Sequence, residues 1–202
     1  MSVAMRVPTP RTLEGAHVRL EPLSLVHLEA LCEAGADPEL WRWTTTSATT
    51  PAEMRSYVDA ALLAQAEGTA LPFATIDRSS GRVVGSTRYG NIDRANRRLE
   101  IGWTWIARPW QRTALNTEAK LLMLRHAFEE LGCMRVELKT DVNNAKSRAA
   151  MLRMGAKEEG IFRKHMLCYG GRVRDTAWYA VVDDDWPAVK AGLEEKLARR
   201  YE

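Results

Sequence analysis

The alternation between Leu99 and Ile106 constrains the fold of this chain more than any other feature of its sequence. Apolar residues alternate there with small or polar ones, and a period of two predicts a strand with two unlike faces. One face carries Leu99, Ile101, Trp103 and Trp105, and the other carries Glu100, Gly102 and Thr104. Such a strand can bury aromatic side chains on one side of a sheet and offer its other side to a functional site.

Strands and helices alternate on both sides of this segment. A capping box of Thr50 and Glu53 predicts a helix that ends at Gly68, and an apolar stripe predicts a longer helix from about Asn116 to Gly132. Shorter helices are expected over 24–35, over 145–154 and from 185, and strands over 18–21, 72–77, 83–89, 135–140, 161–167 and 174–182. The strands between 72 and 106 form an antiparallel meander, and the pattern as a whole indicates an α/β domain.

Length and composition agree with one domain. A chain of 202 residues with 46% hydrophobic residues can bury one sizeable core, so we predict a single domain over 1–202, with its core over about 18–186 and a C-terminal helix over about 186–200. A charged fraction of 27% and a net charge of +3 favour neither a nucleic acid nor a membrane as partner. Cys32, Cys133 and Cys168 show neither disulfide nor metal-site spacing, and the start of the chain shows no signal peptide. We therefore expect a cytoplasmic protein without a metal.

The segment from Gln111 to Thr117 is the first candidate site. It joins the strand at Leu99 to the long helix, and such a turn directs unpaired backbone N–H groups and the positive end of the helix dipole at one point. A pyrophosphate can bind there, with Arg112 adding a charged hydrogen bond and Asn116 and Thr117 either contacting phosphate or capping the helix. The alternative is a capped helix behind a surface loop, because the chain has neither a G-x-G-x-x-G nor a P-loop sequence.

Asn144 and Ser147 form the second candidate site. Asn144 stands at the start of a predicted helix and Ser147 lies one turn inside it, so both can face the same groove. The amide can hold an amide-containing ligand, and the hydroxyl can donate a proton. The alternative is that Asn144 only caps the helix.

In this order the segments resemble the GNAT superfamily of N-acetyltransferases, and within it the RimJ/RimL-type branch that acetylates the N-terminal amine of ribosomal proteins. The resemblance spans Val18 to about Trp186. It rests on Leu99-Glu100-Ile101-Gly102-Trp103, the stretch from Gln111 to Ala119, Asn144-x-x-Ser147, Met154-Gly155-Ala156 and Arg174-Asp175-Thr176. It implies a fold of the α/β (α+β) class, in which helices flank a mixed, mostly antiparallel central sheet. It also implies an acyl-CoA-dependent N-acyltransferase that uses acetyl-CoA and a primary amine of a protein N-terminus or a small molecule. Homodimers are common among similar proteins.

The resemblance also assigns the cofactor site. In such proteins the loop holds the CoA pyrophosphate, the preceding strand pairs with pantetheine, and the Asn-x-x-Ser helix lies beside the thioester. The implied residues are Trp105, Ile106, Ala107, Gln111, Arg112, Thr113, Ala114, Leu115, Asn116, Thr117, Asn144 and Ser147. The loop departs from the family pattern at Ala114 and Asn116, where small residues, mostly glycine, are usual. We expect side-chain bonds from Arg112 and Asn116 to replace the close backbone approach that glycine allows.

Direct attack of a neutral amine on a thioester needs a base for the ammonium proton and a donor for the oxyanion. The resemblance implies a backbone N–H near Trp105 or Ile106 as oxyanion donor and Ser147 as the acid that protonates the thiolate. Our candidate base is Glu100, on the polar face of its strand; alternatively Glu100 pairs structurally with an arginine, or water relays the proton. The base glutamate of RimL-type proteins has no match, since Met166 falls near its place.

Aromatic residues supply shape and a cation–π surface for an incoming ammonium. We therefore predict an acceptor pocket lined by Trp41, Trp43, Trp103 and His165. The alternative for a tryptophan is the core, which is where we expect the rings of Trp103 and Trp105. Two other functions stay open at this point, a non-catalytic module that binds acyl-CoA and a transferase that uses succinyl-CoA.

Overall fold

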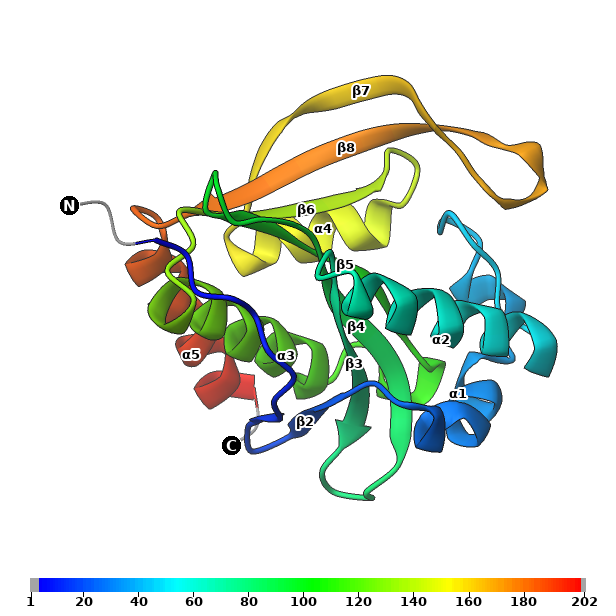
Figure 1. Cartoon of the computed structure of the whole chain (residues 1–202). Helices are drawn as coiled ribbons and strands as arrows, with labels where there is room; N and C mark the ends of the chain where they lie inside the picture. The colour runs from blue at the N-terminus through cyan, green and yellow to red at the C-terminus, as the bar shows by residue number, and fades with distance from the viewer. Residues whose placement is uncertain (1–3, 201–202) are drawn as a thin grey trace.

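The computed structural model describes residues 4–200, which fold into one eight-stranded sheet with helices on both faces (Figure 1). The strand order is β1-β2-β3-β4-β5-β6-β8-β7. The strands are β1 (Leu13–Glu14), β2 (Val18–Pro22), β3 (Leu71–Asp77), β4 (Val83–Asp93), β5 (Arg98–Ile106), β6 (Arg135–Asp141), β7 (Lys157–Leu167) and β8 (Val173–Val182). The helices are α1 (Leu28–Gly35), α2 (Pro51–Ala66), α3 (Ala114–Arg125), α4 (Ala145–Met154) and α5 (Trp186–Arg200).

The sheet is mixed and mostly antiparallel, which confirms the predicted fold class. Only β5 and β6 run parallel, and they pair over Arg98–Glu100 and Arg135–Glu137. Parallel neighbours need a crossover connection, and α3 supplies it. Every other pair of neighbouring strands is antiparallel.

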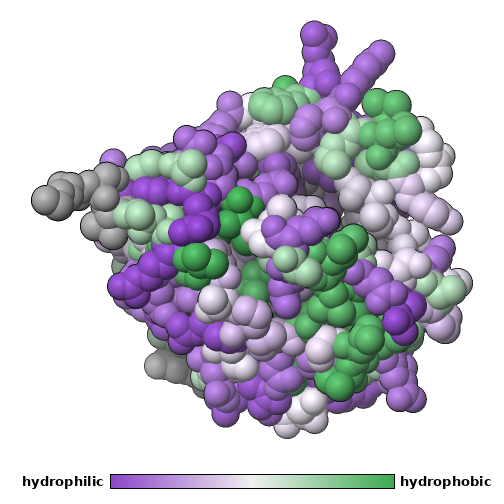
Figure 2. Space-filling model, in the orientation of Figure 1, coloured by the Kyte–Doolittle hydropathy of each residue, from purple (hydrophilic) through white to green (hydrophobic). Residues whose placement is uncertain are grey.

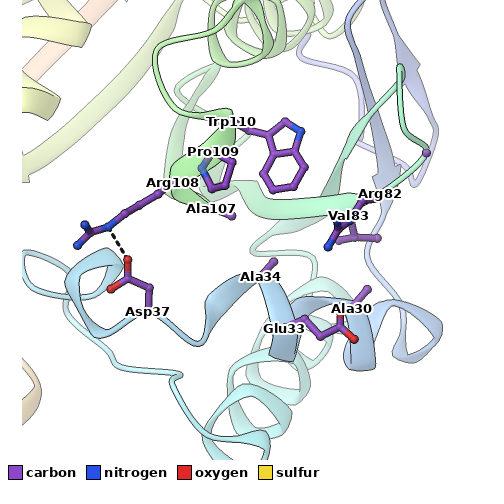
Figure 3. A pocket seen from close by; sticks show the side chains of 11 residues that line it. Ala30, Glu33, Ala34, Asp37, Arg82, Val83, Ala107, Arg108, Pro109 and Trp110 are labelled. Atoms are coloured by element: carbon purple, nitrogen blue, oxygen red, sulfur yellow. Dashed lines mark ion pairs between the residues drawn. The ribbon is translucent and has the colours of Figure 1, made fainter.

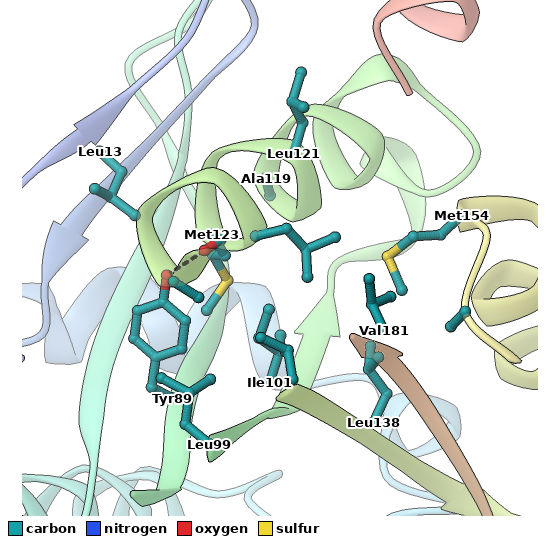
Figure 4. Close-up of a cluster of buried hydrophobic side chains, with 14 of the residues drawn as sticks. Leu13, Tyr89, Leu99, Ile101, Ala119, Leu121, Met123, Leu138, Met154 and Val181 are labelled. Atoms are coloured by element: carbon teal, nitrogen blue, oxygen red, sulfur yellow. Dashed lines mark hydrogen bonds between the residues drawn. The ribbon is translucent and has the colours of Figure 1, made fainter. Parts of the chain in front are cut away.

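Each face of the sheet has its own hydrophobic core. The larger core lies between the sheet and the helices α3, α4 and α5, and it includes Leu99, Ile101, Leu138 and Val181 (Figure 4). Within it the Tyr89 hydroxyl donates to the Met123 carbonyl of α3 at 2.6 Å. The smaller core lies under α1 and α2 and includes Leu31, Met54, Tyr57, Trp41 and Trp105. Leu99 and Ile101 therefore face one core and Trp105 faces the other, so the expectation that all three share one face is wrong for Trp105. The extra residue that β5 carries between Gly102 and Trp105 exchanges the two faces of the strand.

The expected element boundaries hold where local capping sets them. Thr50 accepts from Glu53 N at 3.2 Å and donates from its own N to Glu53 Oε2 at 3.1 Å, which is the predicted capping box of α2. Helix α3 begins at Ala114, earlier than predicted, because Thr113 is its N-cap. The expected continuation to Gly132 includes a π-helical turn at His126–Glu130.

Over residues 4–200, no helix combines the length and the apolar character needed to cross a membrane. In the same range, no group of three His, Cys, Asp or Glu side chains lies together as a metal-ion site requires.

Candidate active site

The sheet splits where its two parallel strands meet. Pairing between β5 and β6 ends at Glu100 and Glu137, although β5 continues to Ile106 and β6 to Asp141. Beyond that point β5 pairs with β4 and β6 pairs with β8 (Figure 1). Each strand therefore has one backbone edge that no neighbouring strand covers, and such an edge can bind an extended ligand.

Helix α3 starts close to the end of β5. A 3₁₀ turn at Arg108–Trp110 leads to Arg112, whose φ is +62°, and then to the N-cap Thr113, which accepts from Leu115 N. The first N–H groups of α3 have no partner within the helix and lie at the positive end of its dipole. The Asn116 side chain adds a buried Oδ1 without a hydrogen-bond partner among the described residues. The backbone donors at this helix start suit an anionic ligand, whereas Asn116 Oδ1 is an acceptor and needs a donor.

Ala114 is the first residue of α3 and needs no positive φ. The left-handed position falls at Arg112 instead, where a non-glycine residue costs roughly 1–2 kcal/mol. The departure from the family's glycine pattern therefore does not prevent the loop from leading into the helix.

Part of the predicted cofactor loop is held by the chain itself. Gln111 Nε2 donates to Ile106 O at 2.8 Å, and Ala107 N donates to Val84 O at 2.8 Å. Leu115 is 2% exposed and belongs to the larger core. The side chains of Gln111 and Leu115 thus stabilise the loop, and the predicted contact of these two residues with the cofactor is left to their backbone.

Two hollows flank Trp110. One, of about 490 Å³, lies between α1 and the 3₁₀ turn, where Figure 3 shows Arg108 paired with Asp37 across its edge. The other, of about 500 Å³, is lined by His17, Arg78 and the helix start, including Thr113 and Ala114. The second hollow therefore borders the N–H groups at the start of α3.

Asn144 caps α4, as the alternative interpretation predicted. Its Oδ1 accepts from Ser147 N at 3.1 Å. The cap uses the backbone N–H of Ser147 and leaves the Ser147 hydroxyl out of it. Thr117 lies in the first turn of α3, and both Thr117 and Ser147 are partly exposed.

Glu100 is buried on the face of β5 that lies opposite α3. Its Oε2 lies 2.7 Å from Lys139 Nζ and accepts from Asn91 Nδ2 at 2.7 Å. The expected structural alternative for Glu100 was an arginine, and the partner is a lysine. A Cβ on Gly102 would lie 2.8 Å from Glu100 Oε1, which explains the glycine two residues after the glutamate.

A β-bulge turns Trp103 out of the core. Ser86 pairs with Trp105 and Arg88 with Gly102, so β5 holds an extra residue, and Trp103 has a φ of +49°. The Trp103 side chain is 37% exposed, whereas Trp105 is 5% exposed. The expectation that both rings fill the core is therefore wrong for Trp103. Its ring lies on the side of the sheet that carries α2 and Glu100, next to Arg88, and we call this side the hollowed face.

A second bulge directs His165 at the same side. Phe162 pairs with Thr176 and Met166 with Arg174, so β7 carries two extra residues there. His165 Nδ1 lies 3.1 Å from Thr176 Oγ1. Burial, together with the charges of Lys139 and Arg174, lowers the pKa of His165 below its usual value of 6.5. The imidazole is therefore neutral at neutral pH and can accept a proton.

Trp178 connects the two bulges. Lys139 Nζ lies 3.8 Å from the centroid of the Trp178 ring, and the His165 ring centroid lies 5.6 Å from it. Glu100, Lys139, Trp178 and His165 therefore form a continuous cluster across β5, β6, β8 and β7. Sequence reasoning identified the two ends of this cluster and missed Lys139 and Trp178. The alternation of Arg135, Glu137 and Lys139 on β6 is the signal that places Lys139 on the same face.

The four predicted acceptor residues separate in the structure. Trp41 is 6% exposed, donates from Nε1 to Gly35 O at 2.8 Å and packs against Trp105, so its assignment to the pocket lining is wrong. Trp43 lies at the edge of this region, where the Arg172 guanidinium is 5.5 Å from its ring centroid. Trp103 and His165 both face the cluster.

The tip of the β7–β8 hairpin closes one side of this region. Tyr169 N donates to Thr45 O at 2.9 Å, which joins the hairpin to the segment between α1 and α2. Figure 2 shows this face of the molecule hollowed between the β7–β8 hairpin and α2. Hydrophobic surface gathers over α1 and α2 (Figure 2). Exposed apolar side chains in this part of the chain include Val26, in the 3₁₀ turn before α1, and Leu63 of α2.

A sheet split at its parallel pair, with a capped helix start at the end of the first split strand, defines the class of the GNAT-fold acetyltransferases. The chain belongs to this family, because the model of the acetyltransferase (GNAT) domain matches residues 17–157. A GCN5-related N-acetyltransferase from Brucella melitensis has a similar structure, with a TM-score of 0.89 and 36% identity, covering 96% of this chain and 88% of that one.

Two further proteins are similar to this chain. The "Putative ribosomal N-acetyltransferase YdaF" of Bacillus subtilis is 36% identical over 110 residues, which cover 54% of this chain and 59% of YdaF. The chain thus aligns with little more than half the length of that relative. Mycobacterium smegmatis RimJ in complex with CoA-disulfide shares the fold, with a TM-score of 0.78 and 23% identity over 93% of this chain and 92% of RimJ.

Proposed function

We propose that this protein transfers an acetyl group from acetyl-CoA to a primary amine, of a protein N-terminus or a small molecule, by direct attack of the amine. The observation that carries the proposal is the split between β5 and β6, with the start of α3 close to the end of β5. The uncovered strand edges suit an amide-containing chain such as pantetheine, and the helix start suits a pyrophosphate.

The residues of the loop would hold the cofactor in defined ways. Backbone N–H groups of Ala114 to Asn116, with side chains of Arg112, Asn116 and Thr117, would bind the phosphates. Trp105 and Ile106 would offer their backbone to pantetheine and to the developing oxyanion. The bound thioester supplies an activated acetyl group, and the Ser147 hydroxyl, which the α4 cap leaves out, would donate a proton to the departing thiolate.

The proton of the amine would leave toward the cluster that Glu100 and His165 share. Glu100 Oε2 is occupied by its contacts with Lys139 Nζ and Asn91 Nδ2. Glu100 Oε1 therefore remains to accept a proton from the amine. His165 is a neutral imidazole at neutral pH, because burial lowers its pKa. Both groups lie on the hollowed face, so we assign both to the proton path, and the acceptor would enter beside Trp43 and Trp103.

The test is binding followed by turnover. Thermal-shift measurements with CoA, acetyl-CoA and succinyl-CoA should show stabilisation that grows with ligand concentration, and a thiol-release assay with a panel of amines should then show transfer. Asn116→Asp places a negative charge at the helix start and should weaken acetyl-CoA binding by roughly 10- to 100-fold. The same change favours the helix itself, because an acidic residue is stabilising in a first turn.

A matched control adds the same charge elsewhere. Ser56→Asp, on the exposed side of α2, should leave acetyl-CoA affinity unchanged. Stabilisation by acyl-CoA without thiol release from any amine would support the non-catalytic alternative. Absence of both binding and transfer would refute the proposal.

A further inference from the structure

The hollowed face carries more positive than negative side chains. Its cations are Arg88, Arg98, Arg135, Lys139, Arg172 and Arg174, and its anions are Glu100, Glu137 and Asp141. Glu137 pairs with both Arg98 and Arg135. Lys139 pairs with Glu100, and Arg172 pairs with Asp141. No carboxylate of residues 4–200 lies within the 4.0 Å ion-pair distance of Arg88 or Arg174. Two guanidinium groups are thus left over after the internal pairs are formed.

Arg88 is held between aromatic rings. Its side chain lies on the same face as Trp103, and its guanidinium lies 5.1 Å from the centroid of Tyr57 and 5.0 Å from that of Trp103. The residue is 6% exposed, and its Nε has no hydrogen-bond partner among the described residues. Arg88 pairs across the strands with Gly102, over which the Glu100 carboxylate lies. It is therefore a buried cation beside the proposed proton path.

Arg174 stands on the other side of the split. It is 7% exposed, and its Nε also has no partner among the described residues. Burial lowers the pKa of its guanidinium, although Asp141 and Glu100 act in the opposite direction. Arg174 lies two positions before Thr176, the residue that holds His165. Both unmatched arginines therefore lie next to groups that we assign to the amine.

A buried guanidinium without a counter-charge is costly unless a ligand supplies one. We infer that Arg88 and Arg174 bind an anionic group, a carboxylate or a phosphate, carried by the amine acceptor. This inference rests on the proposed function and names the substrate class of its site. Guanidinium groups bind both anions through paired hydrogen bonds, and the rings of Trp103, Phe162 and Trp178 suit an apolar body beside the charge.

We assign the anionic group to the amine acceptor and not to the cofactor, because the two arginines lie on the side of the sheet away from the cofactor helices. Arg88 and Arg174 share the side of the sheet with α2 and the β7–β8 hairpin, since Tyr89, next to Arg88, and Ala177, three residues after Arg174 on β8, belong to the opposite core. Helices α3 and α4, which carry the proposed cofactor residues, pack on that opposite side. The anionic group therefore enters from the side away from the cofactor phosphates.

The experiment compares matched amines with the full-length protein. The rate constant kcat/KM for thiol release from acetyl-CoA is measured with L-phenylalanine, L-phenylalaninamide and 2-phenylethylamine, and with O-phosphoethanolamine and ethanolamine. The anionic amines should be preferred by roughly 10- to 100-fold over their neutral counterparts. Arg88→Gln and Arg174→Gln should each remove most of that preference, whereas Arg94→Gln, on an exposed turn, should keep it.

Three results separate this inference from the proposed function. Equal kcat/KM for acidic and neutral amines would overturn the inference and leave the transferase standing. A preference for succinyl-CoA with neutral amines would place the anion on the acyl group and overturn the acceptor assignment. If no amine is acetylated, the proposed function fails, and binding decides the inference. Thermal shifts with N-acetylphenylalanine should then exceed those with its amide, and equal shifts would refute it.

Discussion

Lys120 is buried beside the larger core, and no carboxylate among residues 4–200 pairs with it. Its Nζ donates to Thr104 Oγ1 at 2.8 Å and to Thr87 Oγ1 at 3.4 Å. Burial lowers the pKa of Lys120 from 10.5 to about 7. Between these two values the unfolded chain binds a proton that the folded chain lacks, so the free energy of unfolding should rise with pH across this window.

The size of the effect follows from the difference in pKa. At 1.36 kcal/mol per pKa unit, a shift from 10.5 to about 7 destabilises the folded state by roughly 4 to 5 kcal/mol at and below pH 7. The same relation reduces this penalty by about 2 kcal/mol between pH 7 and pH 9. The penalty disappears above the unfolded value of 10.5.

Lys120→Met removes the titrating group and keeps the length of the side chain. Thr87 and Thr104 still hydrogen-bond to each other at 2.7 Å. Urea unfolding followed by tryptophan fluorescence at pH 7, 8 and 9 should show the stability advantage of the variant shrinking by about 2 kcal/mol from pH 7 to pH 9. Lys196→Met, at an exposed position of α5, should follow the wild type at every pH. Parallel profiles for wild type and Lys120→Met would refute the reasoning.

Three further changes test the site and its support. Gly102→Ala places a Cβ 2.8 Å from Glu100 Oε1, so kcat for acetyl transfer should fall by roughly tenfold while the melting temperature changes little. Glu118→Gln weakens the acceptor of three backbone N–H groups at residues 16–18, and urea unfolding should show a loss of about 1–3 kcal/mol. Wild-type activity should persist below the ordinary imidazole value of 6.5 and fall only at lower pH, because burial lowers the pKa of His165 and a protonated ring cannot accept a proton. Loss of that acidic limb in His165→Gln but not in Glu100→Gln assigns the proton to the imidazole, and the converse assigns it to Glu100.

Local signals were sufficient for much of the fold. The capping box at Thr50 predicted the start of α2, and the alternation of β5 predicted its two faces as far as Gly102, because both depend on residues close in sequence. Beyond Gly102 the bulge exchanges the two faces, so Trp105 lies in the smaller core and Thr104 contacts Lys120 of α3. The two-residue strand β1 has no such signal, since its pairing with β2 is what makes it a strand. The π-helical turn in the helix after Arg125 likewise follows from packing and not from a local pattern.

The candidate site likewise has parts that local sequence signals predict and parts that depend on how the strands pair. The loop and helix start between β5 and α3 are contiguous in sequence, so their position could be predicted from local signals, and their role in cofactor binding stays a prediction. The cluster of Glu100, Lys139 and His165 combines three strands, and its geometry depends on register and on two bulges. An irregular strand moves one ring from the core to the surface, as at Trp103, and the burial of Trp41 depends on a hydrogen bond to Gly35. No pattern of residue types specifies either outcome.

The backbone pairing between β5 and β6, which joins the two halves of the sheet, extends over three residue pairs. A ligand laid between β5 and β6 would contact both halves and lengthen this seam, much as an added strand does. Part of its binding energy would then oppose separation of the halves. The cofactor would be a structural member of the protein for as long as it stays bound, and its departure after each turnover would loosen the molecule along that line.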